Sequence, residues 1–385
     1  MRPDLERFIR PGDGIVLGQA CAEPQTLSAA LVAQRAAFSG ASVFLGVNYA
    51  GIIRPEHADH LRLSAYCGAG HNRALADAGV LEIHPHPYSR LAPLIRERKI
   101  RSDVVLIQVS PPNARGDYSM GLAVDYLLPA IQCARAVVAE VNDRVPWTHS
   151  EKLFRKEDFA LLVESSAEPA AAPPMRAGDA EAAIARHAAE FIPEGATLEF
   201  GLGILPDAIC AALQDRKSLK VHSGTIGDGV ADLMRCGAVA TADCAMLIGT
   251  RKLFEHAREN SAIRLRSTEY THDPRVLASL QKFVAINSAI EVDLTGQINA
   301  EIAKGSYLGA VGGALDFIRA ATFSPGGVAL LVLPAARVVR ALSGPVSTPR
   351  SEAGVIVTER GAADLRGCTL NERMRRMLRI STLEK

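Results

Sequence analysis

Two glycine-rich stretches and four polar side chains are the places in this sequence where chemistry could occur. Gly201-Leu202-Gly203 and Gly312-Gly313 each precede a predicted helix, so some of their backbone N–H groups have no partner inside it. Such groups can bind an oxyanion or a phosphate. The polar candidates stand near predicted strand ends; they are His222, Glu269, His272 and Glu359.

Each of these features also has a purely structural explanation. The glycines suit tight turns, and the dinucleotide pattern G-x-G-x-x-G fails because Pro206 holds its last position. A single His or Glu at a strand end is commonly a surface or hydrogen-bonded core residue. The closely spaced pairs His57/His60 and His84/His86 have no Cys or acidic third ligand nearby, so we expect no metal site.

The segment from residue 219 to 235 organises these candidates. It begins as a strand, becomes a glycine-rich turn at Gly224, and enters a helix for which Asp228 is the expected N-cap. The apolar runs 198–205 and 283–290 predict strands on either side of it. Because open α/β sheets bind ligands at the carboxyl ends of their strands, the residue at the top of this turn matters, and Gly224 has no side chain.

The strand and helix pattern occurs twice, on either side of a linker. Residues 8–16 resemble residues 191–198, and the strand expected at 104–109 resembles the one at 283–290. We therefore predict two α/β domains of similar topology with mainly parallel sheets and an active site at the domain interface. The Ala/Pro-rich stretch divides the chain into a domain at 1–166, a linker at 167–176 and a domain at 177–385.

Bulk composition excludes several classes of function. With 43 basic and 42 acidic side chains there is no electrostatic case for nucleic acid or an anionic membrane. No secretory signal and no apolar run of membrane-spanning length is visible, and the seven cysteines contain no C-x-x-C. We expect a cytoplasmic protein whose cysteines are mostly small buried side chains.

Several long motifs carry a family resemblance. In the first half these are Asp103–Pro112 with Gly116, and Val141-Asn142; in the second half they are Gly201–Asp207, His222-Ser223, residues 286–299, Gly312–Phe317, Thr348-Pro349-Arg350 and residues 357–367. With them the chain resembles the acetyl-CoA hydrolase/transferase family over nearly its whole length.

The resemblance implies a site for an acyl-CoA substrate, with no permanently bound cofactor, and a homodimer. In this family a glutamate attacks the thioester and carries CoA covalently, while backbone amides stabilise the oxyanion. Carried over to this sequence, those amides belong to Leu202 and Gly313. A polar position that is usually Asn falls on His272, and a supporting acid falls on Glu359.

The nucleophilic glutamate should directly follow His222-Ser223, where this sequence has Gly224. Three hypotheses follow. Water could attack in place of the glutamate, with His272 or Glu359 as general base, which predicts hydrolysis of an acyl-CoA thioester or a CoA-linked ketone. Alternatively, the side chain of Glu269 or Glu359 could reach the space above Gly224 and act as the nucleophile, which would preserve CoA transfer to a carboxylate. The third hypothesis is a catalytically inactive acyl-CoA-binding protein.

Overall fold

The computed structural model describes residues 3–171 and 177–384. The chain divides into two compact units: residues 1–172 with 245–270, and residues 173–244 with 271–385. The division near residue 172 falls inside the predicted linker, of which residues 172–176 lie outside the described residues. Residues 245–270, expected in the second domain, belong to the first unit because Val124 N–H and Leu247 N–H make backbone hydrogen bonds with Ala245 and Leu122.

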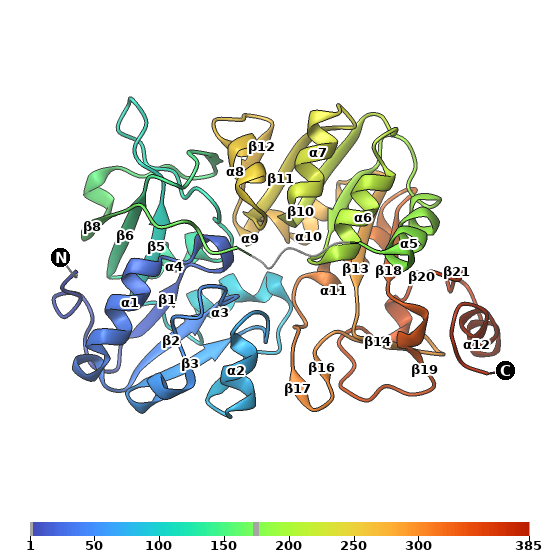
Figure 1. Ribbon diagram of the computed structural model, residues 1–385, viewed down its shortest axis with the longest axis horizontal. Helices are drawn as coiled ribbons and strands as arrows, with labels where there is room; N and C mark the ends of the chain where they lie inside the picture. Colours follow the sequence, from blue (N-terminus) through green and yellow to red (C-terminus); the bar gives the residue numbers. More distant parts are fainter. Residues whose placement is uncertain (1–2, 172–176, 385) are drawn as a thin grey trace. The chain divides into compact units, whose positions relative to one another are not determined.

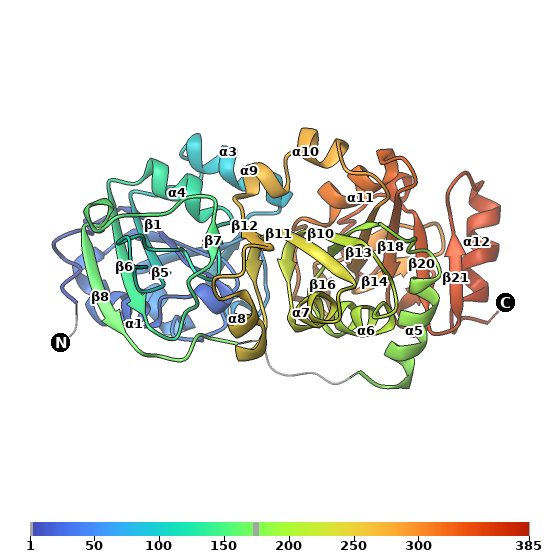
Figure 2. The same cartoon turned by 90° about the horizontal axis from the view of Figure 1, so that it is seen from above.

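The first unit is built on a seven-stranded parallel sheet. Its order is β4-β3-β2-β1-β5-β6-β8, and every pairing in it is parallel. Figure 2 shows helix α1 on one face and helices α3 and α4 on the other. The strands are β1 (Gly14–Leu17), β2 (Ala41–Leu45), β3 (Leu61–Ala65), β4 (Leu81–Ile83), β5 (Val104–Val109), β6 (Ala136–Asn142) and β8 (Leu161–Ser165), and the helices are α1 (Gln25–Gln34), α2 (Asn72–Asp77), α3 (Leu91–Arg96), α4 (Leu127–Cys133) and α8 (Arg251–Ala257).

The second unit is also a three-layer α/β structure. Its strands run in the order β21-β20-β18-β13-β9-β10-β11; the pairings from β20 through β10 are parallel, and β21 pairs antiparallel with β20. Helices α5, α6 and α7 cover one face, and α10 and α11 cover the other (Figures 1 and 2). The strands are β9 (Thr197–Phe200), β10 (Leu219–Ile226), β11 (Val239–Leu247), β13 (Phe283–Ser288), β18 (Val328–Val332), β20 (Val355–Thr358) and β21 (Gly361–Asp364), and the helices are α5 (Asp179–Ala189), α6 (Ile204–Ala212), α7 (Asp228–Arg235), α10 (Pro274–Ala278), α11 (Ala314–Phe323) and α12 (Leu370–Arg379).

The remaining elements are short. The small strands are β7 (His149–Ser150), which pairs with β12 (Ile263–Leu265), then β14 (Glu291–Asp293), β15 (Ile298–Asn299), β16 (Ile302–Ala303), β17 (Ser306–Tyr307) and β19 (Val338–Val339). The short helix α9 covers Thr268–Thr271, and the described residues also form seven short helical turns of the 3-10 type. No helix among the described residues is long and apolar enough to cross a membrane.

The sequence repeat corresponds to a shared strand order. In the first unit, β1 lies between β2 and β5, and in the second unit β9 lies between β10 and β13. Beyond these, β6 and β8 in the first unit correspond to β18 and β20 in the second. The predicted fold class, with two α/β domains of similar topology and mainly parallel sheets, is therefore confirmed.

The structure corrects three predicted elements around Gly224. The strand expected at 198–205 ends at Phe200, and a helix begins at Ile204. Gly224 lies inside β10 rather than in a turn, because the strand continues to Ile226. The N-cap of α7 is Gly227, whereas Asp228 is the first helical residue.

A buried carboxyl group lies in the centre of the second sheet. Glu199 on β9 is 2% exposed, and its Oε2 accepts hydrogen bonds from Ile286 N–H at 3.1 Å and Asn287 Nδ2 at 2.8 Å. Burial outweighs these two bonds and raises the pKa of Glu199 from 4.5 to about 8. The group is therefore protonated in the folded protein at neutral pH.

We predict that Glu199 makes stability depend on pH. Between pH 4.5 and about 8 the Glu199 carboxyl group holds its proton in the folded chain but has lost it in the unfolded chain. Its contribution to the unfolding free energy is therefore fully present below pH 4.5 and is lost as pH rises to about 8. Relative to Glu199→Gln, the unfolding free energy of the native protein should fall by up to about 1.4 kcal/mol per pH unit in that window. Denaturant titrations at several pH values measure this, with exposed Glu190→Gln as the control. Parallel curves for the native protein and Glu199→Gln would contradict the assignment.

Candidate active site

The candidate site lies at the carboxyl ends of three neighbouring strands of the second unit: β13, β9 and β10. Gly201 follows β9, and its N–H donates to Ile286 of β13 at 2.8 Å. On the other side of β9, Ser223 of β10 donates its hydroxyl to Phe200 O at 3.1 Å and accepts from Phe200 N–H at 3.2 Å. These bonds fix the chain on both sides of the glycine loop that follows β9.

His272 is the side chain that links Gly224 to Gly313. A Cβ on Gly224 would lie 3.4 Å from Cε1 and Nε2 of the His272 ring, and a Cβ on Gly313 would lie 2.6 Å from the same Nε2. Phe317 of α11 packs against the imidazole, with the ring centroids 4.6 Å apart. The Nε2 edge of one buried imidazole therefore faces both glycines.

Burial keeps the imidazoles of this site neutral. It lowers the pKa of His272 to about 3, with a smaller effect from the neighbouring His222. Burial also lowers the pKa of His222, although the backbone of Thr271 and the carboxylate of Asp243 oppose this. Because Thr271 O can only accept, its 2.9 Å contact with His222 Nε2 places a proton on that nitrogen. The Thr271 hydroxyl lies 2.9 Å from His272 Nδ1 and holds the second ring in place.

The two glycine loops present unpaired backbone donors. Gly203 has a φ of 121° and is the N-cap of α6, and Gly312 has a φ of 57° and precedes Gly313, the N-cap of α11. In the part of the chain that the structure describes, no acceptor meets the N–H groups of Leu202 or Gly313. Unpaired N–H groups at helix N-termini suit a developing negative charge.

Two of the expected acids lie elsewhere. Glu359 follows β20, which is four strand positions from β10, or about 19 Å at ordinary strand spacing. There its Oε2 accepts from Ala335 N–H at 2.8 Å. Glu269 belongs to the first unit, where both of its carboxylate oxygens bind the Arg96 guanidinium, at 3.0 and 2.7 Å. Within the second unit, the structure does not bring Glu359 to the ring of His272.

Sequence reasoning missed the side chains that hydrogen-bond to or pack against the elements of this site. Glu199 and Asn287 hold β9 and β13 together beneath Gly201, and Phe317 packs against His272. One signal was available, since a charged residue in the short apolar run 197–200 indicates a buried, paired carboxyl group. Phe317 gives no such signal, because an aromatic residue on an amphipathic helix is usual.

Potential metal ligands do not cluster in the described part of the chain. Among residues 3–171 and 177–384, no group of three His, Cys, Asp or Glu side chains is placed to hold a metal ion. The buried cysteines are Cys21, Cys67, Cys210 and Cys244.

Comparison with known proteins agrees with the resemblance found in the sequence. The family model of the acetyl-CoA hydrolase/transferase N-terminal domain matches residues 3–156, and that of the C-terminal domain matches residues 249–383. A 4-hydroxybutyrate coenzyme A transferase of Clostridium kluyveri is 32% identical over 390 residues, which cover 95% of this chain and 90% of that protein. The chain belongs to the acetyl-CoA hydrolase/transferase family.

Relatives of this family member include both enzyme types in the family name. An acetyl-CoA hydrolase of Kluyveromyces lactis is 29% identical over 251 residues, covering 58% of this chain and 47% of that protein. Among solved structures, RipA from Yersinia pestis has a TM-score of 0.93 at 28% identity, over 98% of this chain and 92% of that one. A 4-hydroxybutyrate CoA-transferase from Porphyromonas gingivalis has a TM-score of 0.79 at 28% identity, and the match covers 97% of this chain and 91% of that one.

The two glycines that face His272 should differ sharply in their tolerance of a methyl group. In Gly313→Ala the new Cβ would lie 2.6 Å from the ring, so the imidazole or α11 must move, whereas in Gly224→Ala the contact is an ordinary 3.4 Å. Overpacking of this kind costs about 1–3 kcal/mol. We expect Gly313→Ala to lose that much unfolding free energy in denaturant titrations and Gly224→Ala to lose much less. Equal losses would contradict the placement of the His272 ring.

Proposed function

We propose that this protein hydrolyses an acyl-CoA thioester or a CoA-linked ketone, with water as the attacking group. The observation that carries the proposal is the pairing of Gly224 with His272. The position expected for the nucleophilic glutamate has no side chain, and a Cβ there would lie 3.4 Å from a neutral imidazole nitrogen. A water molecule fits where a carboxylate is missing, and the imidazole provides a proton acceptor for it.

The unpaired N–H groups of Leu202 and Gly313 form the oxyanion hole in this proposal. As water attacks the thioester carbonyl, His272 Nε2 accepts a proton from the water, and the carbonyl oxygen gains negative charge beside the two donors. That negative charge raises the pKa of the nearby imidazole and offsets the effect of its burial. Collapse of the intermediate breaks the C–S bond, and the proton on His272 passes to the departing thiolate.

CoA transfer to a carboxylate is the second candidate, and the transferase names of the relatives favour it. It needs a nucleophilic carboxylate at the site. Glu359 accepts a backbone hydrogen bond beside β18, and Glu269 is engaged by Arg96, so each would have to leave its partner. Covalent attack requires reacting atoms about 3–3.5 Å apart. These engagements make hydrolysis the better-supported function.

Other properties follow from the family membership as proposals. CoA enters as part of the substrate, no permanently bound cofactor takes part, and Gly201, Gly203, Gly312 and Gly313 border the substrate. The active form is a homodimer located in the cytoplasm. An inactive acyl-CoA-binding protein is the outcome if no turnover is found, although the imidazole of His272 and the unpaired N–H groups of Leu202 and Gly313 favour catalysis.

The direct test follows free thiol release from a panel of acyl-CoA compounds, with and without added acetate. We expect release that does not depend on acetate. We also expect His272→Gln to lower the rate by about 10²–10⁴-fold, the range typical of general base catalysis. His60→Gln, which changes a histidine in the first unit, should keep the native rate. Release that requires acetate would favour a transferase, and CoA binding without any release would favour the inactive binder.

Restoring a carboxyl group should change the chemistry. We expect Gly224→Glu to transfer CoA to acetate through a thioester on the new side chain, because the N–H groups and His272 remain in place. Gly224→Gln is the matched control, since it has the same size but cannot form that thioester. Borohydride trapping followed by peptide mass spectrometry detects the adduct. If neither variant gains transfer and both keep the native fold, position 224 does not face the substrate carbonyl.

A further inference from the structure

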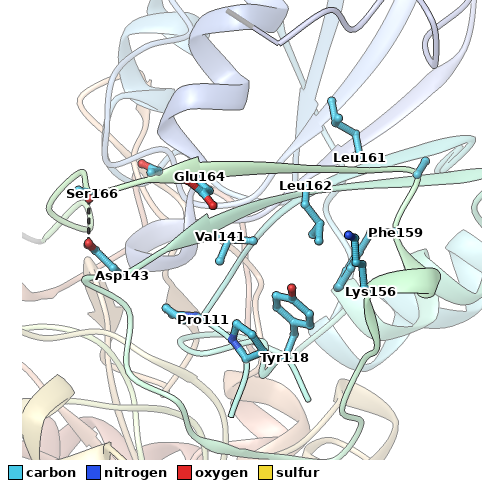
Figure 3. A pocket seen from close by; sticks show the side chains of 13 residues that line it. Pro111, Tyr118, Val141, Asp143, Lys156, Phe159, Leu161, Leu162, Glu164 and Ser166 are labelled. Atoms are coloured by element: carbon cyan, nitrogen blue, oxygen red, sulfur yellow. Dashed lines mark hydrogen bonds between the residues drawn. The ribbon is translucent and has the colours of Figure 1, made fainter. Parts of the chain in front are cut away.

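A separate cavity of about 910 Å³ lies entirely within the first unit, at the edge of its parallel sheet. Its floor is formed by the carboxyl halves of β6 and the edge strand β8, through Val141 and Leu162. Loop residue Pro111 and aromatic residue Phe159 complete the apolar surface (Figure 3). None of the residues discussed for the candidate active site lines it.

The walls of this cavity are held by hydrogen bonds that need no ligand. Tyr118 and Phe154 exchange two backbone hydrogen bonds, at 2.8 and 3.0 Å. The Tyr118 ring meets Phe159 edge-on, with centroids 5.6 Å apart. Asn113 Oδ1 accepts from the N–H groups of Arg115 and Asp117 and braces the preceding loop. The cavity is therefore preformed, which lowers the conformational cost of binding.

One end of the cavity offers donors without partners. Figure 3 shows the Tyr118 hydroxyl and the Lys156 amine turned into the same space beside Phe159. Neither group has a hydrogen-bond or ion-pair partner in the described part of the chain. An ammonium group with a phenol beside it suits a carboxylate.

The other end is acidic. Glu164 has no partner in the described ranges, whereas Asp143 accepts a hydrogen bond from the Ser166 hydroxyl at 2.9 Å and forms an ion pair with Arg144 at 3.6 Å. The two ends are separated along β8 by the stretch from Ala160 to Glu164, which spans about 13 Å in an extended strand. An elongated ligand with opposite charges at its ends therefore matches both the polarity and the length of the cavity.

We propose that this cavity binds an elongated ω-amino carboxylate. Its carboxylate accepts from Lys156 Nζ and the Tyr118 hydroxyl, its chain lies on Val141 and Leu162, and its ammonium group donates to Glu164. A dianion is disfavoured, because the unpaired carboxylate of Glu164 repels a second negative charge. The proposal does not rest on the proposed hydrolase function, since the cavity lies within the first unit and binding is measured without turnover.

Calorimetric titration of the full chain with ω-aminooctanoate, octanoate and octylamine tests the proposal. We expect the zwitterion to bind about two- to fivefold more tightly than either single-charge analogue, because each analogue forms only one of the two exposed charge contacts. Lys156→Met should weaken the binding of the zwitterion and of octanoate but not the binding of octylamine. Glu164→Gln should weaken the binding of the zwitterion and of octylamine but not the binding of octanoate.

Two controls separate direct contact from general charge effects. Glu157→Gln removes a negative charge beside Lys156 without lining the cavity, and Lys99→Met removes a distant exposed lysine; both should bind like the native chain. Tyr118→Phe keeps the aromatic ring that lines the cavity and removes only the hydroxyl group. It should weaken the binding of the two ligands that carry a carboxylate and leave octylamine binding unchanged. Absence of binding by all three compounds to the native chain would overturn the proposal, as would affinities that the Lys156 and Glu164 variants leave unchanged.

Discussion

The packing of one buried imidazole against two glycines is the constraint on which the rest of the site depends. His272 is 2% exposed, faces Gly313 so closely that no side chain fits there, and leaves only ordinary contact distance above Gly224. Because the ring is buried beside a second histidine, it remains neutral and can only exchange hydrogen bonds or take up a proton. Any reaction at this position must therefore use a neutral nitrogen and whatever occupies the space above Gly224.

The sheet explains why these groups meet. Parallel strands deliver their carboxyl ends to one edge, and β13, β9 and β10 are neighbours there, so the loop after β9 and the end of β10 lie together. Glu199 and Asn287 fasten the strands below the loop with a protonated carboxyl group. Gly313 arrives separately, at the start of α11, and contacts the site through His272. Sheet, helix N-terminus and imidazole thus each supply one part of the arrangement.

Much of this architecture could be predicted from sequence, and the failures have physical causes. The β-branched run at 104–109 is a parallel strand with the predicted bounds, and the repeated motifs correspond to one strand order in both units. The glycine and threonine at residues 224 and 225 predict a turn, but pairing with neighbouring strands extends β10 to Ile226. The family resemblance assigns both Glu359 and His272 to the site, and both stand near predicted strand ends. Spacing along the chain does not reveal strand order, and β20 lies four positions away from β10.

In the proposed reaction water, not a side chain of the protein, attacks the substrate. A single turnover in water labelled with heavy oxygen, with the protein in excess over an acyl-CoA, distinguishes the two routes. Direct attack places the label in the released acid and leaves every peptide of the chain unlabelled. Hydrolysis through a thioester on a glutamate would place the label in that glutamate, and detection of the labelled glutamate by peptide mass spectrometry would rule out direct attack by water.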